Sequence, residues 1–408
     1  MQFSILGEAG WGQSRHSWEI FLMCRSCAVW SVLSVCVLGN ATVLAQTPGT
    51  VEVTRLPAGE LQPQVVAGSD GVLHRVTFRG DPASGDAWYA RRTAGSSEWS
   101  PPIQVNHQSG NLVATGTIRG PQLAVGPNGR VHVVWNGSSK ATPRGPGKYD
   151  APLLYARMSN DQSGFEPERD VIGSAYVLDG GSSVAADAEG RVFVIWHAGS
   201  TGEENRRVWM ARSTDEGVTF ETEMAIDPNS DGACGCCGLK AGADARGTVY
   251  VLFRSARERK HRDMQLLMSR DHGQTFQVRP LGLWQVDACP MSSETFAESD
   301  NEVAVAWETR GQIEFARINK RTGAVGMTQS APGKPGGRRL PALAFNSQGE
   351  LLLTWTEGTG WNRGGSVAWQ MYDARGSAVG KTGSQGDLPV WSFATPCARG
   401  DGSFEILY

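Results

Sequence analysis

The chain has 408 residues, and its 38 Lys and Arg against 41 Asp and Glu give a formal net charge of −3. This slight acidity provides no basic excess, so the composition does not support a nucleic-acid-binding surface or a polybasic membrane-binding patch. Apolar residues make up 40% of the chain, and its 51 Gly and 20 Pro exceed the usual share without reaching a low-complexity composition. These numbers predict a folded, turn-rich protein that has no nucleic-acid partner.

The N-terminal segment, residues 1–45, has the features of a leader and secretory signal peptide. Residues 28–39 form a short apolar run after a basic residue, and small residues follow up to Ala45, which predicts cleavage after Ala45. The run is too short to span a bilayer securely, so we expect no stable membrane span after cleavage. Because residues 1–22 make an unusually long leader, the true start is predicted at Met23. The mature protein is therefore expected in the periplasm or outside the cell.

The rest of the chain, residues 46–408, repeats one unit of short strands and polar turns. Each unit has an apolar second strand that ends in an aromatic residue, and these ends recur roughly every 50 to 60 residues at Phe78, Trp135, Trp196, Phe253, Trp307, Trp355 and Tyr408. Such a period is typical of a propeller or an array of repeats. No stretch after residue 46 holds an apolar period of 3.6 residues over the length of a helix. The fold class is therefore all-β, and a single β-propeller domain of four-stranded blades is predicted.

Closure of the ring depends on the two ends of this region. The seventh unit supplies only two strands, residues 389–397 and 402–408, whereas residues 51–55 read as an isolated fourth strand. Pairing these strands would close the ring and remove the exposed edges of an open array. Seven blades closed by N- and C-terminal strands are predicted, and six blades are the alternative if the terminal piece only decorates another blade.

Two turns between the third and fourth strands share one motif. Unit three carries Ser213-Thr-Asp215-Glu-Gly217-Val-Thr-Phe220, and unit four carries Ser269-Arg-Asp271-His-Gly273-Gln-Thr-Phe276. They resemble the Asp boxes, S-x-D-x-G-x-x-F/W, of the sialidase-like (BNR repeat) β-propeller superfamily. Ser and Asp side chains can bond the N–H groups of the turn, and Gly accepts a positive φ. We therefore interpret both boxes as structural staples remote from the functional face.

Propeller connectivity gathers the ends of all second strands at one end of the channel. The residues that follow the second-strand aromatics would then surround this opening: Arg79, Asn136, His197, Arg254, Glu308 and Thr356, with Arg310 and Glu357 close behind. A ring that offers Arg, His and Glu suits an anionic or hydroxylated ligand. Each of these residues can also be a polar strand end that enters solvent.

The resemblance to sialidases implies specific chemistry at this opening. Those enzymes hold a substrate carboxylate with an arginine cluster and use a Tyr nucleophile assisted by Glu, together with an Asp acid/base. The sequence from Arg338 to Leu343 is similar to the arginine motif of that family, and it places Arg339 at the opening. The resemblance thus implies that Arg254 and Arg339 hold an anionic sugar group, with His197 and Arg310 beside them. In a hydrolase, Glu308 or Glu357 would supply acid/base assistance.

Five cysteines follow the predicted signal peptide, and four of them precede neighbouring first strands. Cys234, Cys236 and Cys237 lie just before unit four, and Cys289 lies at the matching place before unit five. In an oxidising compartment, five cysteines suggest up to two disulfides and one odd thiol. We expect a disulfide between Cys289 and one of the other three, with Cys397 as the odd thiol. Alternatively, the gathered thiolates bind Cu or Zn, with His197 nearby, or stay free. No other cofactor is expected.

The sequence leads to three kinds of function for a secreted monomer. The first is carbohydrate-directed, either a sialidase-like glycoside hydrolase or a glycan-binding protein that uses the channel opening. The alternatives are a non-enzymatic scaffold that binds a protein or cell-wall partner and a cysteine-based metal site.

Overall fold

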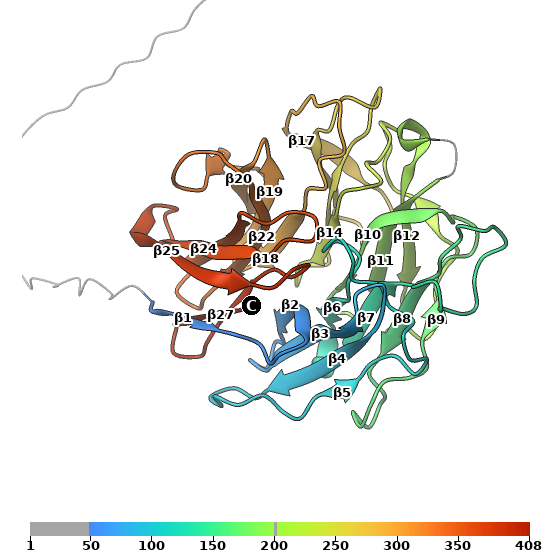
Figure 1. Cartoon of the computed structure of the whole chain (residues 1–408), viewed down its shortest axis with the longest axis horizontal. Helices are drawn as coiled ribbons and strands as arrows, with labels where there is room; N and C mark the ends of the chain where they lie inside the picture. The colour runs from blue at the N-terminus through green and yellow to red at the C-terminus, as the bar shows by residue number, and fades with distance from the viewer. Residues whose placement is uncertain (1–48, 200–201) are drawn as a thin grey trace, which may run out of the picture. The chain divides into compact units, whose positions relative to one another are not determined.

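The computed structural model describes residues 49–199 and 202–408. The predicted leader, the start at Met23 and the cleavage after Ala45 lie outside these residues. Within the unit Pro48–Tyr408, strands form seven separate sheets. Figure 1 shows the sheets arranged as blades around a common centre. The prediction of an all-β propeller with seven blades is confirmed, and the six-bladed alternative is wrong.

Six blades are four-stranded antiparallel sheets whose strands follow each other outward in chain order. Blade 1 contains β2 (Glu60–Ala67), β3 (Leu73–Asp81), β4 (Ser84–Arg92) and β5 (Ile103–Gln104), and blade 2 contains β6 (Gln122–Val125), β7 (Val131–Asn136), β8 (Leu153–Arg157) and β9 (Arg169–Asp170). Blade 3 contains β10 (Leu178–Ala186), β11 (Val192–Ala198), β12 (Arg207–Ser213) and β13 (Met224–Ala225).

Blade 4 contains β14 (Leu239–Ala243), β15 (Val249–Arg254), β16 (Met264–Ser269) and β17 (Gln277–Gly282), and blade 5 contains β18 (Glu294–Glu298), β19 (Glu302–Thr309), β20 (Gln312–Asn319) and β21 (Gln329–Ser330). Blade 6 contains β22 (Arg338–Phe345), β23 (Leu351–Glu357), β24 (Gly365–Tyr372) and β25 (Ala378–Leu388). Two short 3₁₀ turns, η1 (Pro127–Gly129) and η2 (Glu203–Asn205), complete the described elements.

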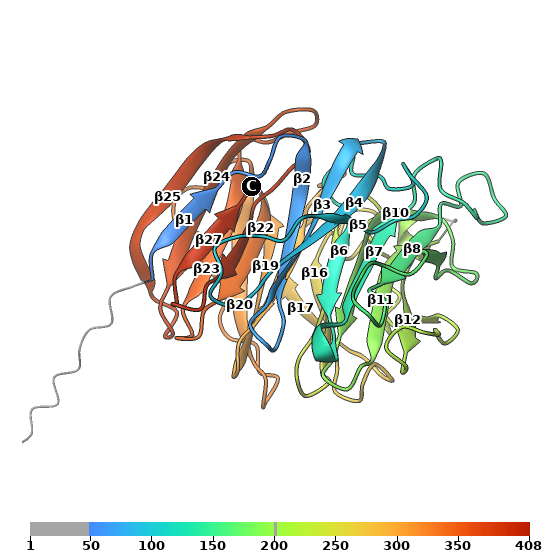
Figure 2. The same cartoon turned by 90° about the horizontal axis from the view of Figure 1, so that it is seen from below.

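Blade 7 closes the ring and has three described strands. β26 (Thr395–Ala398) and β27 (Phe404–Leu407) are antiparallel, and β1 (Val51–Thr54) pairs with β27 in parallel register. Figure 2 shows β1 and β27 side by side. The predicted closure is confirmed, but β1 takes the third position of its blade rather than the fourth. The physical reason is that β27 offers the open edge, and a parallel β1 delivers the chain to the start of β2.

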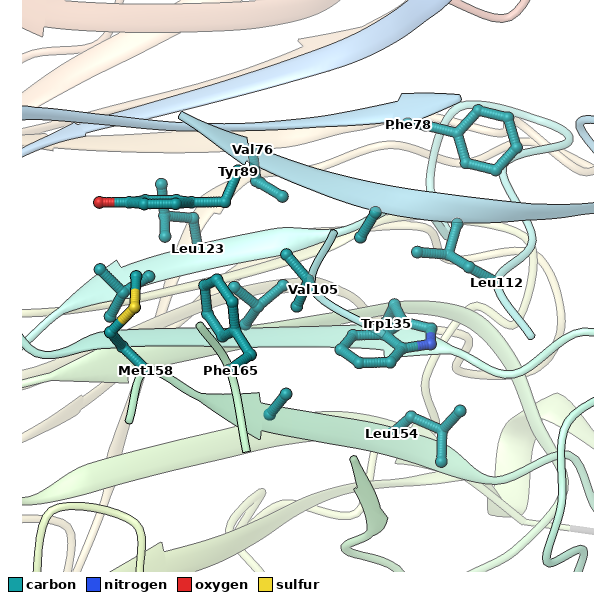
Figure 3. Close-up of a cluster of buried hydrophobic side chains, with 14 of the residues drawn as sticks. Val76, Phe78, Tyr89, Val105, Leu112, Leu123, Trp135, Leu154, Met158 and Phe165 are labelled. Carbon is teal, nitrogen blue, oxygen red and sulfur yellow. The ribbon is translucent and has the colours of Figure 1, made fainter. Parts of the chain in front are cut away.

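The side chains of each second strand pack against the neighbouring blades, and this packing explains the apolar sequence of these strands. The aromatic residues at their ends are nearly fully buried: Phe78, Trp135, Trp196, Phe253, Trp307 and Trp355. Figure 3 shows the cluster between blades 1 and 2, which contains Phe78 and Trp135, and there Tyr89 meets Phe165 edge to face at 5.5 Å. Replacing one of these aromatics by Ala would cost about 3 to 5 kcal/mol of unfolding free energy.

The two Asp boxes stabilise their turns through hydrogen bonds, as predicted. In blade 3 the Gly217 N–H donates to Ser213 Oγ at 2.9 Å, and the Thr219 N–H donates to Asp215 Oδ1 at 2.9 Å. Gly217 has φ +77°, and a Cβ atom there would lie 1.8 Å from the Tyr155 hydroxyl of blade 2. Phe220 packs edge to face on Tyr155 at 4.9 Å. The box therefore joins two blades, at the end of β12 opposite to the channel opening.

Blade 4 repeats this arrangement. The Gly273 N–H donates to Ser269 Oγ at 2.8 Å, and the Thr275 N–H donates to Asp271 Oδ1 at 2.9 Å. Phe276 packs against the apolar cluster between blades 3 and 4. Both boxes thus have a structural role in the described propeller.

Candidate functional site

The innermost strands of all seven blades enclose a central channel of about 940 Å³. Its walls carry both apolar and polar side chains, and Lys240 donates to Gln122 Oε1 at 2.9 Å and to Gln64 Oε1 at 3.3 Å. Desolvation inside the channel lowers the pKa of Lys240 to about 8, although Glu294 raises it. Burial raises the pKa of Glu294 well above its usual value, and neither carboxyl oxygen has a hydrogen-bond partner among the described residues.

One end of this channel is the channel mouth, where the inner strands begin and the second strands end. The register of the sheets establishes this, because Glu60 pairs with Arg79, Leu239 with Phe253 and Arg338 with Glu357. The prediction of which strand ends meet here is therefore consistent with the topology. The structure also shows that several of the predicted side chains turn inward between blades instead of facing the opening.

Arg254 is such a residue, and the structure corrects its predicted role in ligand contact. It is only 1% exposed, and its Nε donates to Ser292 Oγ at 2.7 Å. The two other guanidinium nitrogens donate to the carbonyl oxygens of Arg262 and Glu308, and the group lies over the Trp284 ring at 4.8 Å. With its donors used inside the protein, Arg254 ties blade 4 to blade 5 and cannot reach a ligand.

His197, Glu357 and Arg310 are also held away from the centre of the mouth. His197 is buried with Nε2 3.3 Å from the Cys237 carbonyl oxygen, and desolvation lowers its pKa to about 4. The Glu357 carboxylate accepts from Arg338 Nε at 3.0 Å and from Trp355 Nε1 at 2.8 Å.

Arg310 has φ +55° in the turn that joins β19 to β20, and its side chain is exposed there. The structure thus does not bring His197, Glu357 or Arg310 together as a ligand-binding group.

Glu308 and Arg339 do meet at the mouth. Glu308 is 3% exposed, its Oε1 lies 4.0 Å from Arg339 Nε, and its Oε2 has no hydrogen-bond partner among the described residues. Burial raises the pKa of Glu308 to about 8, against the attraction of Arg339 and Arg254 for the ionised form. This pKa favours the protonated form of the buried carboxyl group at neutral pH.

A small pocket beside Arg339 completes the site. We call it the mouth pocket, and its lining includes Arg339, Thr359, Trp361, Arg363, Trp391 and Ser392. Trp361 is 62% exposed, and its ring stands edge to face with Trp391 at 6.3 Å.

The sequence analysis missed Trp361, Trp391 and Arg363. The available signal was connectivity, because their loops join strands two and three of blade 6 and lead into blade 7, and both kinds of loop lie at the mouth.

Cys234, Cys236 and Cys237 gather beneath the mouth on one turn. The sulfur of Cys234 lies 3.5 Å from that of Cys236 and 3.0 Å from that of Cys237. All five described cysteines are free, and Cys289 is exposed. The predicted disulfide of Cys289 is therefore not formed in the structure, because the side chain of Cys289 faces solvent in its loop while the other three sulfurs face one another.

The three thiols differ in their electrostatics. Burial would raise the pKa of Cys237, but hydrogen bonds from Cys234 and Cys236 and the charge of Arg254 lower it well below its usual value. Hydrogen bonding to Cys236 and Cys237, together with burial, raises the pKa of Cys234. The three thiols are therefore electrostatically unequal, and ionisation is favoured most at Cys237.

No protein-family model matches the chain, and no curated protein matches it. Solved structures do match. A protein of unknown function from Dyadobacter fermentans DSM 18053 has a TM-score of 0.48 and 13% identity over 83% of this chain and 98% of its own. The Hadza microbial sialidase Hz136 has a TM-score of 0.47 and 12% identity, and the match covers 81% of this chain and 66% of the sialidase.

The Penicillium chrysogenum α-L-arabinanase has a TM-score of 0.46 and 13% identity over 78% of this chain and 95% of its own. The likeness is one of fold. The predicted sialidase-like propeller is confirmed at that level, by blades and Asp boxes present in the chain itself. At these identities no residue role passes from the solved structures to this chain.

Among the described residues, no helix has the length and apolar character that crossing a membrane requires.

Proposed function

We propose that this protein binds a carbohydrate that carries an anionic group, at the channel mouth. The observation that carries the proposal is the exposed ring of Trp361 beside Arg339, whose Nε lies 4.0 Å from the buried carboxyl of Glu308. Apolar faces of sugar rings stack on indole rings. A guanidinium can grip a carboxylate with two parallel hydrogen bonds, and a neutral carboxyl can donate to a sugar oxygen. The mouth pocket offers the first two of these contacts, and the Glu308 carboxyl lies outside its lining, 4.0 Å from Arg339 Nε.

Binding is better supported than hydrolysis. No Tyr lines the channel or the mouth pocket among the described residues, so a Tyr nucleophile of the sialidase kind has no candidate there. Of the two arginines expected to hold an anionic group, Arg254 is buried, and the arginines that line the mouth pocket are Arg339 and Arg363. Hydrolysis remains a second candidate on one observation, the pKa of Glu308 near 8, which suits a general acid.

Titration calorimetry tests the proposal with 3′-sialyllactose, an oligogalacturonide and neutral arabinobiose as probes. We expect an anionic sugar to bind, and Trp361→Ala and Arg339→Ala each to weaken its affinity at least about 10-fold. Arg339→Lys should recover only part of the loss, because an ammonium lacks the planar fork. Tyr149→Ala serves as the matched control, since Tyr149 is exposed but does not line the pocket.

A result in which none of the three sugars binds, or in which Trp361→Ala binds as tightly as the native protein, refutes the proposal. Release of reducing ends from the bound sugar would show hydrolysis instead. Glu308→Gln should abolish that release if Glu308 is the acid, and should leave it unchanged if it is not.

We further propose that the protein acts as a monomer outside the cytoplasm. The support is the predicted signal peptide together with a ring whose edges are already paired within one chain. Light scattering on the purified protein measures its mass in solution, and mass spectrometry identifies the N-terminus. A mature protein that retains residues 23–45 would contradict export by cleavage after Ala45.

A further inference from the structure

The turn formed by residues 234–237 places three cysteine sulfurs together. Every pair of sulfurs lies within 4.8 Å, and the shortest separations are 3.0 Å between Cys234 and Cys237 and 3.5 Å between Cys234 and Cys236. Metal–sulfur bonds of about 2.3 Å set three sulfurs roughly 3.8 to 4.0 Å apart around one ion. The sulfurs therefore need only small adjustments to surround a single metal ion.

Backbone hydrogen bonds hold this turn from both sides. The Cys234 N–H donates to the Arg254 carbonyl at 2.8 Å, and the Gly238 N–H donates to the Ser292 carbonyl at 2.8 Å. Gly235 leaves room for a neighbouring side chain, since a Cβ atom there would lie 1.6 Å from Arg206 Nη1. The cluster is thus fixed between blades 4 and 5 before any ion binds.

Charged and polar groups surround the sulfurs as thiolate ligands of a metal require. Ser292 Oγ lies 3.5 Å from the Cys237 sulfur and accepts from Arg254 Nε, which positions it. The buried Arg262 guanidinium interacts electrostatically with Cys234 and Cys236. Its Nη2 pairs with Glu203 at 2.6 Å, while Nε and Nη1 have no hydrogen-bond partner among the described residues. The buried Arg262 guanidinium thus keeps two donors that no described residue satisfies.

We propose that Cys234, Cys236 and Cys237 bind one Cu(I) ion as a three-coordinate thiolate site, with Arg262 and the Arg254–Ser292 pair as supporting groups. This site is separate from the mouth pocket and does not depend on the proposed carbohydrate binding.

Copper(I) fits better than other thiophilic metals. Structural zinc sites take four ligands in a tetrahedron, and iron–sulfur clusters are held by four cysteines. Among the described residues, the group of ligand atoms consists of the three sulfurs alone. His197, expected as a neighbour, meets the Cys237 carbonyl through Nε2 instead of joining the sulfurs. Soft thiolates and a coordination number of three suit Cu(I).

When Cu(I) binds, it replaces the protons of the cysteine thiols, and the oxidation state of the copper does not change. Each sulfur that carries a proton releases it to solvent as its copper–sulfur bond forms. Three thiolates and one Cu(I) carry a net charge of −2. The guanidinium groups of Arg254 and Arg262 offset this charge within the buried site.

Anaerobic competition with the Cu(I) complex of bathocuproine disulfonate tests the site on the full exported protein. We expect one equivalent of Cu(I) to transfer, with luminescence typical of copper thiolates. Each of Cys234→Ser, Cys236→Ser and Cys237→Ser should lower the Cu(I) affinity at least about 100-fold. Cys289→Ser and Cys397→Ser are matched controls, because both cysteines lie outside the cluster, and their affinity should stay unchanged.

Arg262→Met tests the supporting role. We expect a loss of about 10- to 100-fold in Cu(I) affinity, a shift of the luminescence band, and partial recovery in Arg262→Lys. Arg259→Met is its control, since Arg259 pairs with Glu204 at the exposed surface. Thermal unfolding measured on each variant confirms that the fold is retained.

Three outcomes overturn the proposal: a copper stoichiometry that does not change in the cluster variants, zinc that displaces Cu(I) from the protein, or a Cys234–Cys237 disulfide found by peptide mapping of the protein as exported. The last outcome would make the turn a redox pair instead of a metal site.

Discussion

Arg92 Nη1 donates to Glu405 Oε2 at 2.6 Å across the seam between the first and the last blade. The two residues are 313 positions apart in sequence, and both side chains are only 4% exposed. Glu405 also accepts from Thr54 Oγ1 at 2.8 Å, so one carboxylate on β27 binds side chains of both β4 and β1. This ion pair supplements the backbone pairing of β1 with β27 in closing the ring.

Removing the Glu405 carboxylate should therefore destabilise the whole propeller. Glu405→Ala leaves the Arg92 guanidinium buried without its charge partner, and such a loss costs about 3 to 5 kcal/mol of unfolding free energy. Glu52→Ala is the control, because Glu52 pairs with Arg399 at the surface and such pairs contribute about 1 kcal/mol or less. Urea unfolding measures both. Equal losses in the two variants would remove the seam pair from this role.

Acid should weaken the same seam. Burial would raise the pKa of Glu405, but bonds from Arg92 and Thr54 outweigh it and hold the pKa below its usual value. A lowered folded-state pKa gives stability that is present above the unfolded-state pKa and lost as the pH falls. The loss of unfolding free energy caused by Glu405→Ala should therefore become smaller as the pH falls below about 4.5. A penalty that is constant from pH 7 to pH 3 would contradict this linkage.

Deletion of residues 49–57 tests closure through the backbone. Without β1, the N–H and C=O groups along β27 lose their parallel partner, and an unpaired edge invites pairing with another chain. We expect a lower Tm, a broader unfolding transition and self-association in light scattering. Val51→Ala keeps the backbone pairing and should show only a small loss of Tm. An unchanged Tm in the deleted protein would show that the ring does not need β1.

The Asp boxes should matter for stability and not for ligands. Asp215→Ala removes acceptors for the Thr219 N–H and hydroxyl and for Ser213 Oγ, and we expect a loss of about 1 to 2 kcal/mol. Sugar affinity at the mouth should not change, since the box lies at the other end of β12. Denaturant unfolding and calorimetry on one preparation measure both quantities. A variant that keeps its stability but loses sugar binding would place function at this turn.

The blade count and the strand ends that meet at the channel mouth could be predicted because both depend on period and connectivity. The aromatic residue that ends each second strand marks one blade, and strand order then determines which loops share a face. Closure was predictable for the same reason, because the isolated strand at residues 51–55 could pair with the incomplete last unit and complete its blade. Its parallel direction was not, because a strand's sequence carries no sign of its direction.

The side-chain directions at the mouth could not be read in the same way. Arg254 and Glu308 both follow a second-strand aromatic and are both buried, yet Arg254 binds groups of the neighbouring blade whereas Glu308 approaches Arg339 at the mouth. That difference depends on which acceptors the neighbouring blade offers, and Ser292 supplies one to Arg254. Trp361 and Trp391 lie in irregular loops where no period marks them. Cys289 matches the other cysteines in position along its unit but not in burial.

The raised pKa of Glu308 predicts a pH dependence that its isostere should lack. Burial raises the pKa of this carboxyl to about 8 in the folded protein, from a usual value of 4.5. Between these values the folded chain keeps the proton and the unfolded chain releases it, so the stability that Glu308 contributes is complete below pH 4.5 and is lost as the pH rises towards 8. Glu308→Gln has no proton to lose, so its advantage over the native protein should grow from pH 5 to pH 8.

The difference in unfolding free energy between the two proteins isolates this effect, because all other titrating groups are common to both. We expect it to rise by on the order of a few kcal/mol over that range and then to level off. Arg339→Met provides a second test. Arg339 favours the ionised form of Glu308. Removing the charge of Arg339 should therefore raise the pH at which the difference in unfolding free energy levels off. A flat difference for Glu308→Gln in urea unfolding at pH 5, 6.5, 8 and 9 would mean that Glu308 is ionised at neutral pH and cannot donate a proton at the mouth.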